Sequence, residues 1–264
     1  MHTNIGYSIP IRQQSPLDNT LLNFLPHKCY QHLRNHLQQT RMRSGEIILD
    51  FKHPLQYLYF PTTCIFSRNY IMEDGTSTEV VLIGKEGLVG VNQLMGGDSS
   101  TCTHVVQSEG CAYRVNKCLL ETEFNKGGAL QHTLLLYMQA LITQISQTIV
   151  CNRYHTIEQQ LCRWLLLCID RLDTNNLHMT HEQIALNLGV RRESVTAAAY
   201  HLQSDNIIQY RRGLISVLDR RQLEVRVCEC YSVVQHEYNR LHELTGRGLS
   251  VNPFQLNGQQ AAIN

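Results

Sequence analysis

The chain has 264 residues, a formal net charge of +1 and 43% hydrophobic residues. This length predicts two domains, and the hydrophobic content suffices for a packed core, which argues against wholesale disorder. A net charge so close to zero says nothing by itself about a nucleic-acid partner.

No run of about 18 apolar residues occurs, so neither a transmembrane helix nor a membrane partner is expected. Residues 1–10 lack the basic and apolar stretches of a secretory signal, and the predicted location is the cytoplasm. None of the ten cysteines has Cys-x-x-Cys spacing, so reduced and mostly buried thiols are expected. No nucleophile motif, phosphate loop or pair of catalytic carboxylates is found, so we expect neither an enzyme nor a cofactor.

The first half of the chain predicts a β-rich domain. Residues 1–20 are polar and predict a flexible lead-in, and residues 21–40 predict a short helical segment that Leu25-Pro26 breaks. Within residues 21–128, runs rich in β-branched and aromatic residues alternate with glycine and proline turns, which is typical of an antiparallel barrel or sandwich. The runs are Glu46–Phe51, Gln56–Phe60, Cys64–Met72, Thr76–Ile83, His104–Gln107 and Cys111–Val115.

Residues 129–155 predict one long helix with two apolar stripes. One stripe consists of Leu130, Leu134, Tyr137, Leu141, Ile145 and Thr148, and the other of Leu135, Met138, Ile142 and Ile149. One stripe can cover the chain's own barrel, and a second protomer is the natural partner for the other, through a coiled-coil-like seam. The alternative is a helix buried on both sides within one domain. We assign to the dimer interface Leu134, Tyr137, Leu141, Ile145 and Thr148.

Residues 156–221 contain two short helices joined by a glycine turn. A capping box of Thr156 and Gln159 starts a helix that runs to about Leu172, and Thr180 with Gln183 forms a second box. Gly189 then makes the turn between the two short helices. Apolar residues at helical spacing give the pair an inner face, as in a helix-turn-helix. They are Ile184, Ala185, Leu188, Val190, Val195, Ala198, Ala199 and Leu202.

The outer face of the second short helix carries residues suited to DNA. Arginine can contact guanine with two hydrogen bonds, and glutamate can accept one from cytosine. The two β runs Ile207–Arg212 and Leu214–Leu218 flank Gly213 and predict a wing whose arginines contact phosphates. The candidate base-reading residues are Arg191, Arg192, Glu193 and Thr196, and the candidate phosphate contacts are Thr180, Tyr200, Arg211 and Arg212. The alternative is a solvated charged surface.

The C-terminal region predicts one more amphipathic helix over residues 222–244, followed by a loose tail over residues 245–264. Its apolar residues recur every three or four positions, which is the helical period. They are Leu223, Val227, Tyr231, Val234, Tyr238 and Leu241.

This order of elements resembles the Crp/Fnr family, which includes the cyclic-AMP receptor and the fumarate–nitrate regulators. The resemblance covers about residues 21–221 and is carried by Gly189-Val190-Arg191-Arg192-Glu193-Ser194-Val195. The added C-terminal helix is similar to one branch of the family, as are Tyr59-Phe60-Pro61-Thr62-Thr63 and Gln160-Leu161-Cys162-Arg163-Trp164-Leu165.

The resemblance implies an α+β fold with an N-terminal antiparallel β-roll of the cyclic-nucleotide-binding type, a long dimerisation helix and a C-terminal winged helix-turn-helix. It also implies a bacterial transcription regulator that binds a partly palindromic double-stranded DNA operator as a homodimer, with RNA polymerase as a further partner. Arg192 and Glu193 would then read bases.

The sequence departs from the family at several of its functional positions. Arg191 replaces a small polar cap, and Ala197 replaces a further arginine of the cyclic-AMP receptor, so the operator preference does not transfer. In the phosphate cassette, the glutamate falls on Val91 and the arginine on Thr101. Because His104 would be mostly neutral at about pH 7, a buried phosphate lacks a cation, and we expect no binding of cyclic AMP or cyclic GMP. The alternative is that Arg114 takes the role of the family arginine. The candidate effector pocket consists of Val91, Gly96, Gly97, Thr101 and Cys102.

The signal that such a regulator would sense is not identified by the sequence. The clustered N-terminal cysteines of iron–sulfur sensors are missing. An alternative function is a metal or redox sensor that uses Cys228, Cys230 and His236. If the two cysteines lie on one helix at i and i+2, their thiols face apart and suit one metal poorly, so no metal site is assigned.

Overall fold

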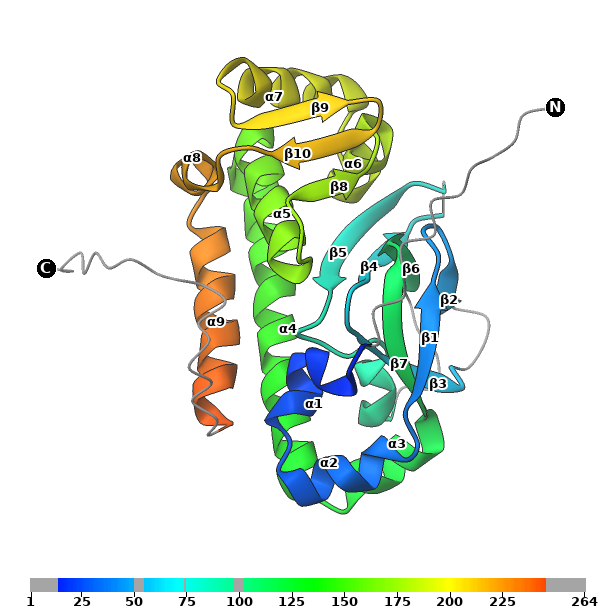
Figure 1. The fold of residues 1–264 in the computed structure, drawn as a ribbon. Coiled ribbons are helices and arrows are strands. Elements are labelled where there is room, and N and C mark those ends of the chain that lie inside the picture. Colours follow the sequence, from blue (N-terminus) through cyan, green and yellow to red (C-terminus); the bar gives the residue numbers. More distant parts are fainter. Residues whose placement is uncertain (1–13, 50–54, 74, 97–101, 246–264) are drawn as a thin grey trace, which may run out of the picture.

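The computed structural model of the chain describes residues 14–49, 55–73, 75–96 and 102–245. A β-rich N-terminal domain lies beside a long helix, and a small winged domain sits at one end of that helix (Figure 1). The mixed helix and sheet content and this order of parts agree with the predicted fold class.

The N-terminal domain is a β-roll of two antiparallel sheets. One has the order β1-β7-β3, formed by Gln38–Met42, Gly110–Asn116 and Tyr57–Pro61. The other has the order β2-β6-β4-β5, formed by Ile47–Leu49, Thr103–Ser108, Ile65–Ile71 and Ser77–Ile83. Large apolar side chains that are almost fully buried form its core, among them Leu58, Phe60, Ile65, Phe66 and Leu82.

Short helices surround the roll. They are η1 Pro16–Asp18, α1 Thr20–Phe24, α2 His27–Arg34, η2 Val91–Met95 and α3 Lys117–Asn125. The break at Leu25-Pro26 is confirmed, whereas part of the predicted helical segment is the strand β1. Of the predicted flexible lead-in, residues 1–13 lie outside the described residues. In the described part, the buried Asn19 donates hydrogen bonds to the carbonyl groups of Pro61 and Gly87, each at 2.9 Å, which attaches this segment to the roll.

The long helix α4 (Ala129–Tyr154) leads into α5 (Ile157–Arg171) at a sharp joint. His155 caps the end of α4, and the predicted capping box of Thr156 and Gln159 starts α5. The expected single C-terminal helix is instead two helices, α8 (Arg220–Arg226) and α9 (Cys230–Leu244). Helix α9 runs antiparallel along α4 (Figure 1).

The stripe of α4 that was assigned to the dimer seam is mostly buried within the protomer, and Met138 of the other stripe is buried too, at 7% exposed. Leu134, Tyr137 and Leu141, assigned to a dimer seam, are 1%, 0% and 6% exposed, because the protomer's own core covers them. The Tyr137 hydroxyl donates to the carbonyl of Leu88 at 3.3 Å in the roll. Ile145 and Thr148 are half-buried. The face left exposed carries Leu135, Ile142 and Ile149.

Among the described residues, α4 is the one helix long and apolar enough to cross a membrane, with a mean hydropathy of 1.4 in its most apolar window. The sequence-based expectation missed it because uncharged polar residues interrupt the apolar run without lowering its mean hydropathy much. Within this protein, 39% of that window is buried, and the helix packs against β5 and α9.

A buried hydrogen-bonded network joins the roll, α4, α5 and α9. Gln144 on α4 donates to the carbonyl of Leu82 at 3.2 Å, and its Oε1 accepts from Arg171 at 3.1 Å and from the Tyr238 hydroxyl at 3.0 Å. Arg171 also donates from Nε to Glu86 at 2.7 Å. The relative placement of these four parts is therefore fixed by polar contacts as well as by apolar packing.

Glu79 on β5 is a buried carboxyl group that contacts α5. Its Oε1 accepts a hydrogen bond from Trp164 Nε1 at 3.1 Å, and its Oε2 accepts one from Ser67 Oγ at 2.7 Å. Burial raises the pKa of Glu79 to about 7, although these hydrogen bonds and the charges of Arg163 and Arg171 favour the carboxylate. The folded protein therefore holds a proton that the unfolded chain releases near pH 4.5.

The stability linked to this proton is complete below about pH 4.5 and is lost as the pH rises through about 7. In the wild type, the free energy of unfolding should fall as the pH rises over this range. In Glu79→Gln the fall should be smaller by up to roughly 3 kcal/mol, because glutamine does not titrate. Urea denaturation followed by the fluorescence of Trp164, the single tryptophan, measures it. The exposed control Glu243→Gln should keep the wild-type profile, and a wild-type profile in Glu79→Gln would contradict the assignment.

Candidate nucleic-acid interface

Two short helices at the free end of the molecule form the helix-turn-helix. Helix α6 (His181–Leu188) begins with the predicted capping box, in which Thr180 Oγ1 accepts from the amide of Gln183 at 3.2 Å. Gly189 ends α6 with a φ of +66°, a conformation that costs other residues about 1–2 kcal/mol. Helix α7 (Arg192–Ser204) follows after two residues.

The predicted inner face of this pair is buried as expected. Val190 is half-buried and packs against the core, and the other seven residues are at most 8% exposed. They are Ile184, Ala185, Leu188, Val195, Ala198, Ala199 and Leu202. Because this face holds α7 rigidly, the opposite face is free to contact a ligand.

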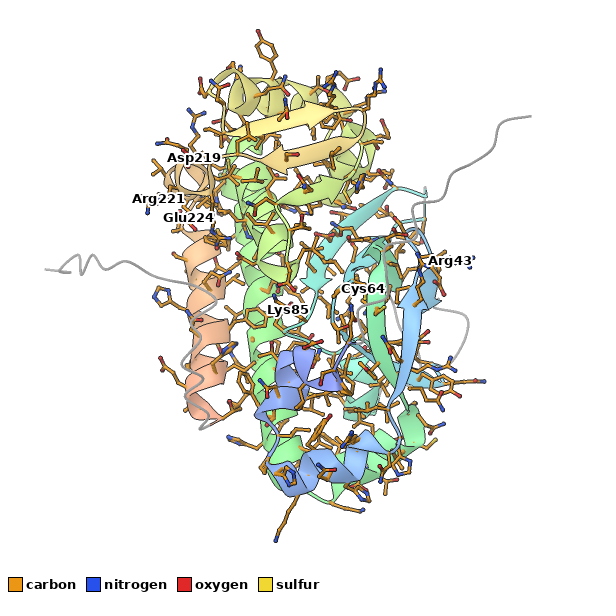
Figure 2. All side chains as sticks on the ribbon, viewed as in Figure 1. Arg43, Cys64, Lys85, Asp219, Arg221 and Glu224 are labelled. Carbon is orange, nitrogen blue, oxygen red and sulfur yellow. The ribbon has the colours of Figure 1, made fainter. Side chains whose placement is uncertain are left out.

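The outer face of α7 projects into solvent at the end of the molecule opposite α2 (Figure 2). All four candidate base-reading residues, Arg191, Arg192, Glu193 and Thr196, are exposed. Tyr200, one turn further on, is 68% exposed. The nearest counter-charge to Arg192 is Glu182, and the 3.9 Å between its carboxylate and Arg192 Nε is a weak, exposed pairing that leaves the guanidinium available.

The predicted wing is a hairpin beside α7. Strands β9 (Ile208–Arg211) and β10 (Leu214–Val217) pair antiparallel, and β10 also pairs with β8 (Asn176–His178). Arg212 and Gly213 form the turn with φ values of +50° and +77°, the combination that a type I′ hairpin turn requires. Arg211 and Arg212 are both exposed. The turn therefore presents two adjacent cations beside the outer face of α7.

His181 connects the three elements of this surface and was missed in the sequence. Its Nδ1 lies 3.0 Å from Thr196 Oγ1 on α7, and its ring stacks on Tyr210 of the wing at a centroid distance of 4.0 Å. Burial and then the charge of Arg192 lower the pKa of His181, which favours the neutral ring. His181 is the first residue of α6 and does not belong to its apolar pattern, so nothing in the sequence indicated this role.

The candidate effector residues are only partly described. Gly97 and Thr101 lie outside the described residues. Val91 begins η2 and is 6% exposed, Gly96 ends η2 with a φ of +85°, and Cys102 is buried. The structure therefore places Val91 and Gly96 at the two ends of η2, and the full pocket stays a prediction.

His104 was considered as a substitute cation for a bound phosphate. It is 1% exposed on β6, and burial, followed by the charge of Arg68, lowers its pKa to about 3. The side chain is therefore neutral at neutral pH, as expected. The absence of cyclic-nucleotide binding stays a prediction.

Residues 159–226 match the family model of the Crp-like helix-turn-helix domain. The match runs from α5 through α8 and includes both helices of the pair and the wing. No curated protein matches the chain. The comparison thus identifies the type of this domain independently of its geometry.

Several solved structures share the fold. FixK2 from Bradyrhizobium japonicum has a TM-score of 0.63 at 17% identity over 73% of this chain and 98% of FixK2. A putative Crp/Fnr family transcriptional regulator from Eubacterium rectale gives 0.62 at 17% identity over 79% and 98% of the two chains. The c-di-GMP-responsive global regulator CLP from Xanthomonas campestris gives 0.59 at 12% identity over 73% and 99%. The chain therefore has the fold of Crp/Fnr family transcription regulators.

Gly189 offers a test of how this domain is seated on the β-roll. A Cβ added there would lie 3.0 Å from Thr78 Oγ1 on β5, whereas Gly45, with a similar φ of +82°, has nothing within 4 Å. We expect Gly45→Ala to cost about 1–2 kcal/mol of unfolding free energy and Gly189→Ala to cost more. In a chain that already carries Thr78→Ala, Gly189→Ala should cost no more than Gly45→Ala does. Urea denaturation measures the three single variants and the double variant Gly189→Ala/Thr78→Ala. Equal costs at the two glycines would contradict this contact.

Proposed function

We propose that this chain, with its Crp-like helix-turn-helix domain, is a transcription regulator of the Crp/Fnr type that binds a specific DNA operator as a homodimer. The cytoplasm of a bacterium is its expected location. Regulation would be exerted through DNA contacts and through RNA polymerase, and we expect no enzymatic activity. The signal that it senses is not assigned.

The observation that carries the proposal is the division of α7 into two faces. The inner face is buried against α5 and α6, while Arg191, Arg192 and Glu193 stand exposed on the first turn. Recognition helices read base edges with their N-terminal residues, and guanine and cytosine are the bases that arginine and glutamate contact best. With α7 in the major groove, the wing arginines Arg211 and Arg212 would contact the phosphate backbone beside that groove.

The proposed dimer uses the exposed face of α4. From His132 to Ile149, the exposed residues of α4 follow each other at alternating spacings of three and four, the pattern of a coiled-coil seam. Leu135, Ile142 and Ile149 occupy every seventh position of this face and are 51%, 59% and 67% exposed. Apolar side chains at one heptad position along a 26-residue helix suit a second copy of the same helix. This seam replaces the stripe assigned from the sequence.

The two classes of arginine are expected to behave differently on DNA. Arg192→Ala should cost about 1–3 kcal/mol on the cognate site and relax base preference there. Arg212→Asn should weaken all sequences alike and reduce the salt slope by about 1, while asparagine suits the positive φ of the turn. The cognate site comes from selection of bound genomic fragments, followed by titrations at several salt concentrations.

Arg240→Ala is the matched control, because Arg240 lies on α9 and pairs with Glu237, away from the outer face of α7 (Figure 1). It should bind DNA as the wild type does. If Arg192→Ala and Arg212→Asn both weaken cognate and random DNA to the same degree, α7 does not read bases.

The revised seam is tested by charge placed on opposite faces of α4. Ile142→Asp should give folded monomers with weakened operator binding, because a dimer would bury the two introduced carboxylates in its interface without partners. Leu141→Asp should instead destabilise the protomer, since Leu141 is 6% exposed within it. Val225→Asp, at an apolar position on α8 that is 76% exposed, should stay dimeric. Light scattering and circular dichroism distinguish these outcomes, and a dimeric Ile142→Asp would exclude this seam.

A further inference from the structure

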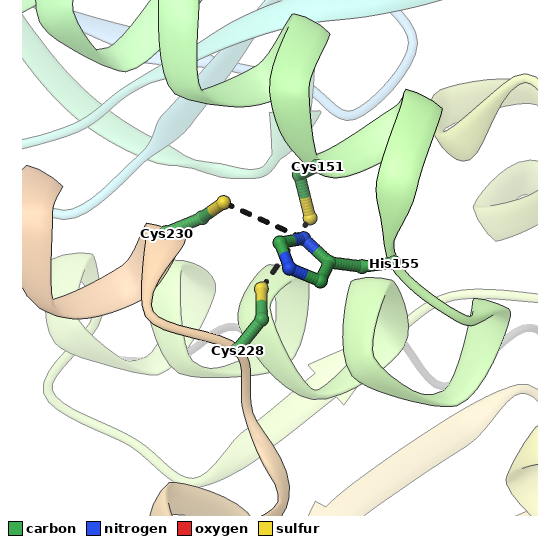
Figure 3. Close-up of side chains that lie close together, drawn as sticks. All are labelled: Cys151, His155, Cys228 and Cys230. Atoms are coloured by element: carbon green, nitrogen blue, oxygen red, sulfur yellow. Dashed lines mark hydrogen bonds between the residues drawn. The ribbon is translucent and has the colours of Figure 1, made fainter.

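Four side chains with metal-binding atoms meet at the joint between α4 and α5 (Figure 3). Cys151 and His155 come from the C-terminal end of α4, and Cys228 and Cys230 come from the turn before α9 and its first residue. Their ligand atoms all lie within 4.8 Å of one another. The three cysteines are at most 5% exposed and form a cluster separate from the main hydrophobic core.

This cluster differs from the one considered in the sequence. His236 is exposed, and its Nδ1 lies 2.8 Å from the carbonyl of Ser232 on its own helix. The objection that the two thiols face apart fails, because Cys228 lies in the turn after α8 and only Cys230 is within α9. The turn directs both thiols toward α4, where His155 takes the place given to His236 and Cys151 adds a third sulfur.

We propose that Cys151, His155, Cys228 and Cys230 bind one zinc-class divalent cation in a closed tetrahedral site. Zinc–sulfur bonds of about 2.3 Å at tetrahedral angles place two sulfur ligands about 3.8 Å apart. The Sγ atoms of Cys151 and Cys228 are 3.6 Å apart, and Cys230 Sγ is 3.6 Å from His155 Nδ1. Three thiolates and one imidazole are a common ligand set of structural zinc.

The surroundings of the cluster suit the charged complex. His155 Nε2 lies 3.3 Å from the carboxylate of Glu229, so the proton sits on Nε2 and the lone pair of Nδ1 faces the thiols. One dication with three thiolates carries a net charge of −1. Burial lowers the pKa of Arg163, and ionised forms of the three cysteines or of Glu79 would counteract that shift. Its Nη2 donates to Thr148 at 3.0 Å, whereas its Nε has no hydrogen-bond partner among the described residues. The complex would place a negative charge beside this buried guanidinium, in addition to the titratable Glu79.

Binding of one ion releases three thiol protons to solvent, while His155 contributes a lone pair and no electron is transferred. Because the protein supplies all four ligands, no position stays open for a substrate, and the role of the ion is structural. It fastens the start of α9 to the end of α4, beside the joint from which α5 leads to the helix-turn-helix. Removal of the ion should therefore loosen α9.

The test uses the full chain, purified under reducing and anaerobic conditions without added chelator. We expect about one zinc per chain by elemental analysis, and cobalt(II) reconstitution should give the intense visible bands of a tetrahedral ion with thiolate-to-metal charge transfer. Cys151→Ala and Cys228→Ala should lose both signals. The controls Cys162→Ala, buried on α5, and His236→Ala should retain them.

Cysteine alkylation of the wild-type chain removes any dependence on the folding of variants. Cys151, Cys228 and Cys230 should be protected in the zinc-loaded protein and become reactive on chelation, whereas the exposed Cys118 should react in both states. Reduced protein without metal and without the cobalt spectrum would overturn the proposal. A disulfide between Cys151 and Cys228 in the freshly isolated protein would also overturn it. Neither result bears on DNA binding, which is measured separately.

Discussion

The burial of one guanidinium group constrains how the parts of this protein can be arranged. Arg171 is 4% exposed, and an unpaired cation at that depth would cost several kcal/mol. Its donors reach Glu86 after β5, Gln144 on α4 and the carbonyl of Leu167 on α5. Gly84 belongs to the same constraint, because a Cβ there would lie 2.6 Å from Arg171 Cβ. Separation of the roll, α4 and α5 would therefore either expose the Arg171 guanidinium to solvent or leave it buried without its partners.

Helix α9 is attached to the long helix α4, to α1 beside the roll and to α5. Near its middle, the Tyr238 hydroxyl donates to Gln144, and near its end the ring of His242 packs edge-on against Phe24 at 4.7 Å. The proposed metal site adds a further attachment at its start. Helix α8 is bound to α5 through the ion pair of Arg220 with the buried Asp170, at 2.8 Å. Helix α9 uses the same carboxylate, because Tyr231 and Gln235 donate hydrogen bonds to it at 2.9 and 2.7 Å. Asp170 thus holds α8 and the first turns of α9 to α5, while the later turns of α9 are held by α4 and α1.

How far the sequence predicts this structure depends on the range of the interactions involved. Glycine and proline turns mark most strands of the roll, and local capping and periodicity define the helix-turn-helix down to its buried residues. Strand β1 (Gln38–Met42) was not predicted from the sequence, because it is mostly polar and is defined by its pairing with β7. The break before α9 was not predicted either, because Leu223, Val227 and Tyr231 keep helical spacing across it. Periodicity also showed two apolar stripes on α4 but not which one the protomer's own core would cover.

The candidate sites follow the same division. The base-reading and wing residues adjoin local patterns, so their exposure could be predicted. The cysteine cluster joins residues 77 positions apart, Cys151 and Cys228, and only tertiary packing brings them together. His181 likewise gains its partners on α7 and the wing from the fold alone.

The composition of the seam proposed for α4 would affect how strongly two protomers associate. Its apolar positions alternate with Gln139, Ser146 and Arg153, which are also exposed and contribute little apolar area. Polar residues at such positions define register and oligomeric state at a cost in stability. Protomer association would then be weak enough to respond to concentration, and an operator with two half-sites would supply the remaining free energy by mass action. Occupancy of the promoter would rise more steeply than linearly with the amount of protein in the cell, so that expression level itself becomes a regulatory input.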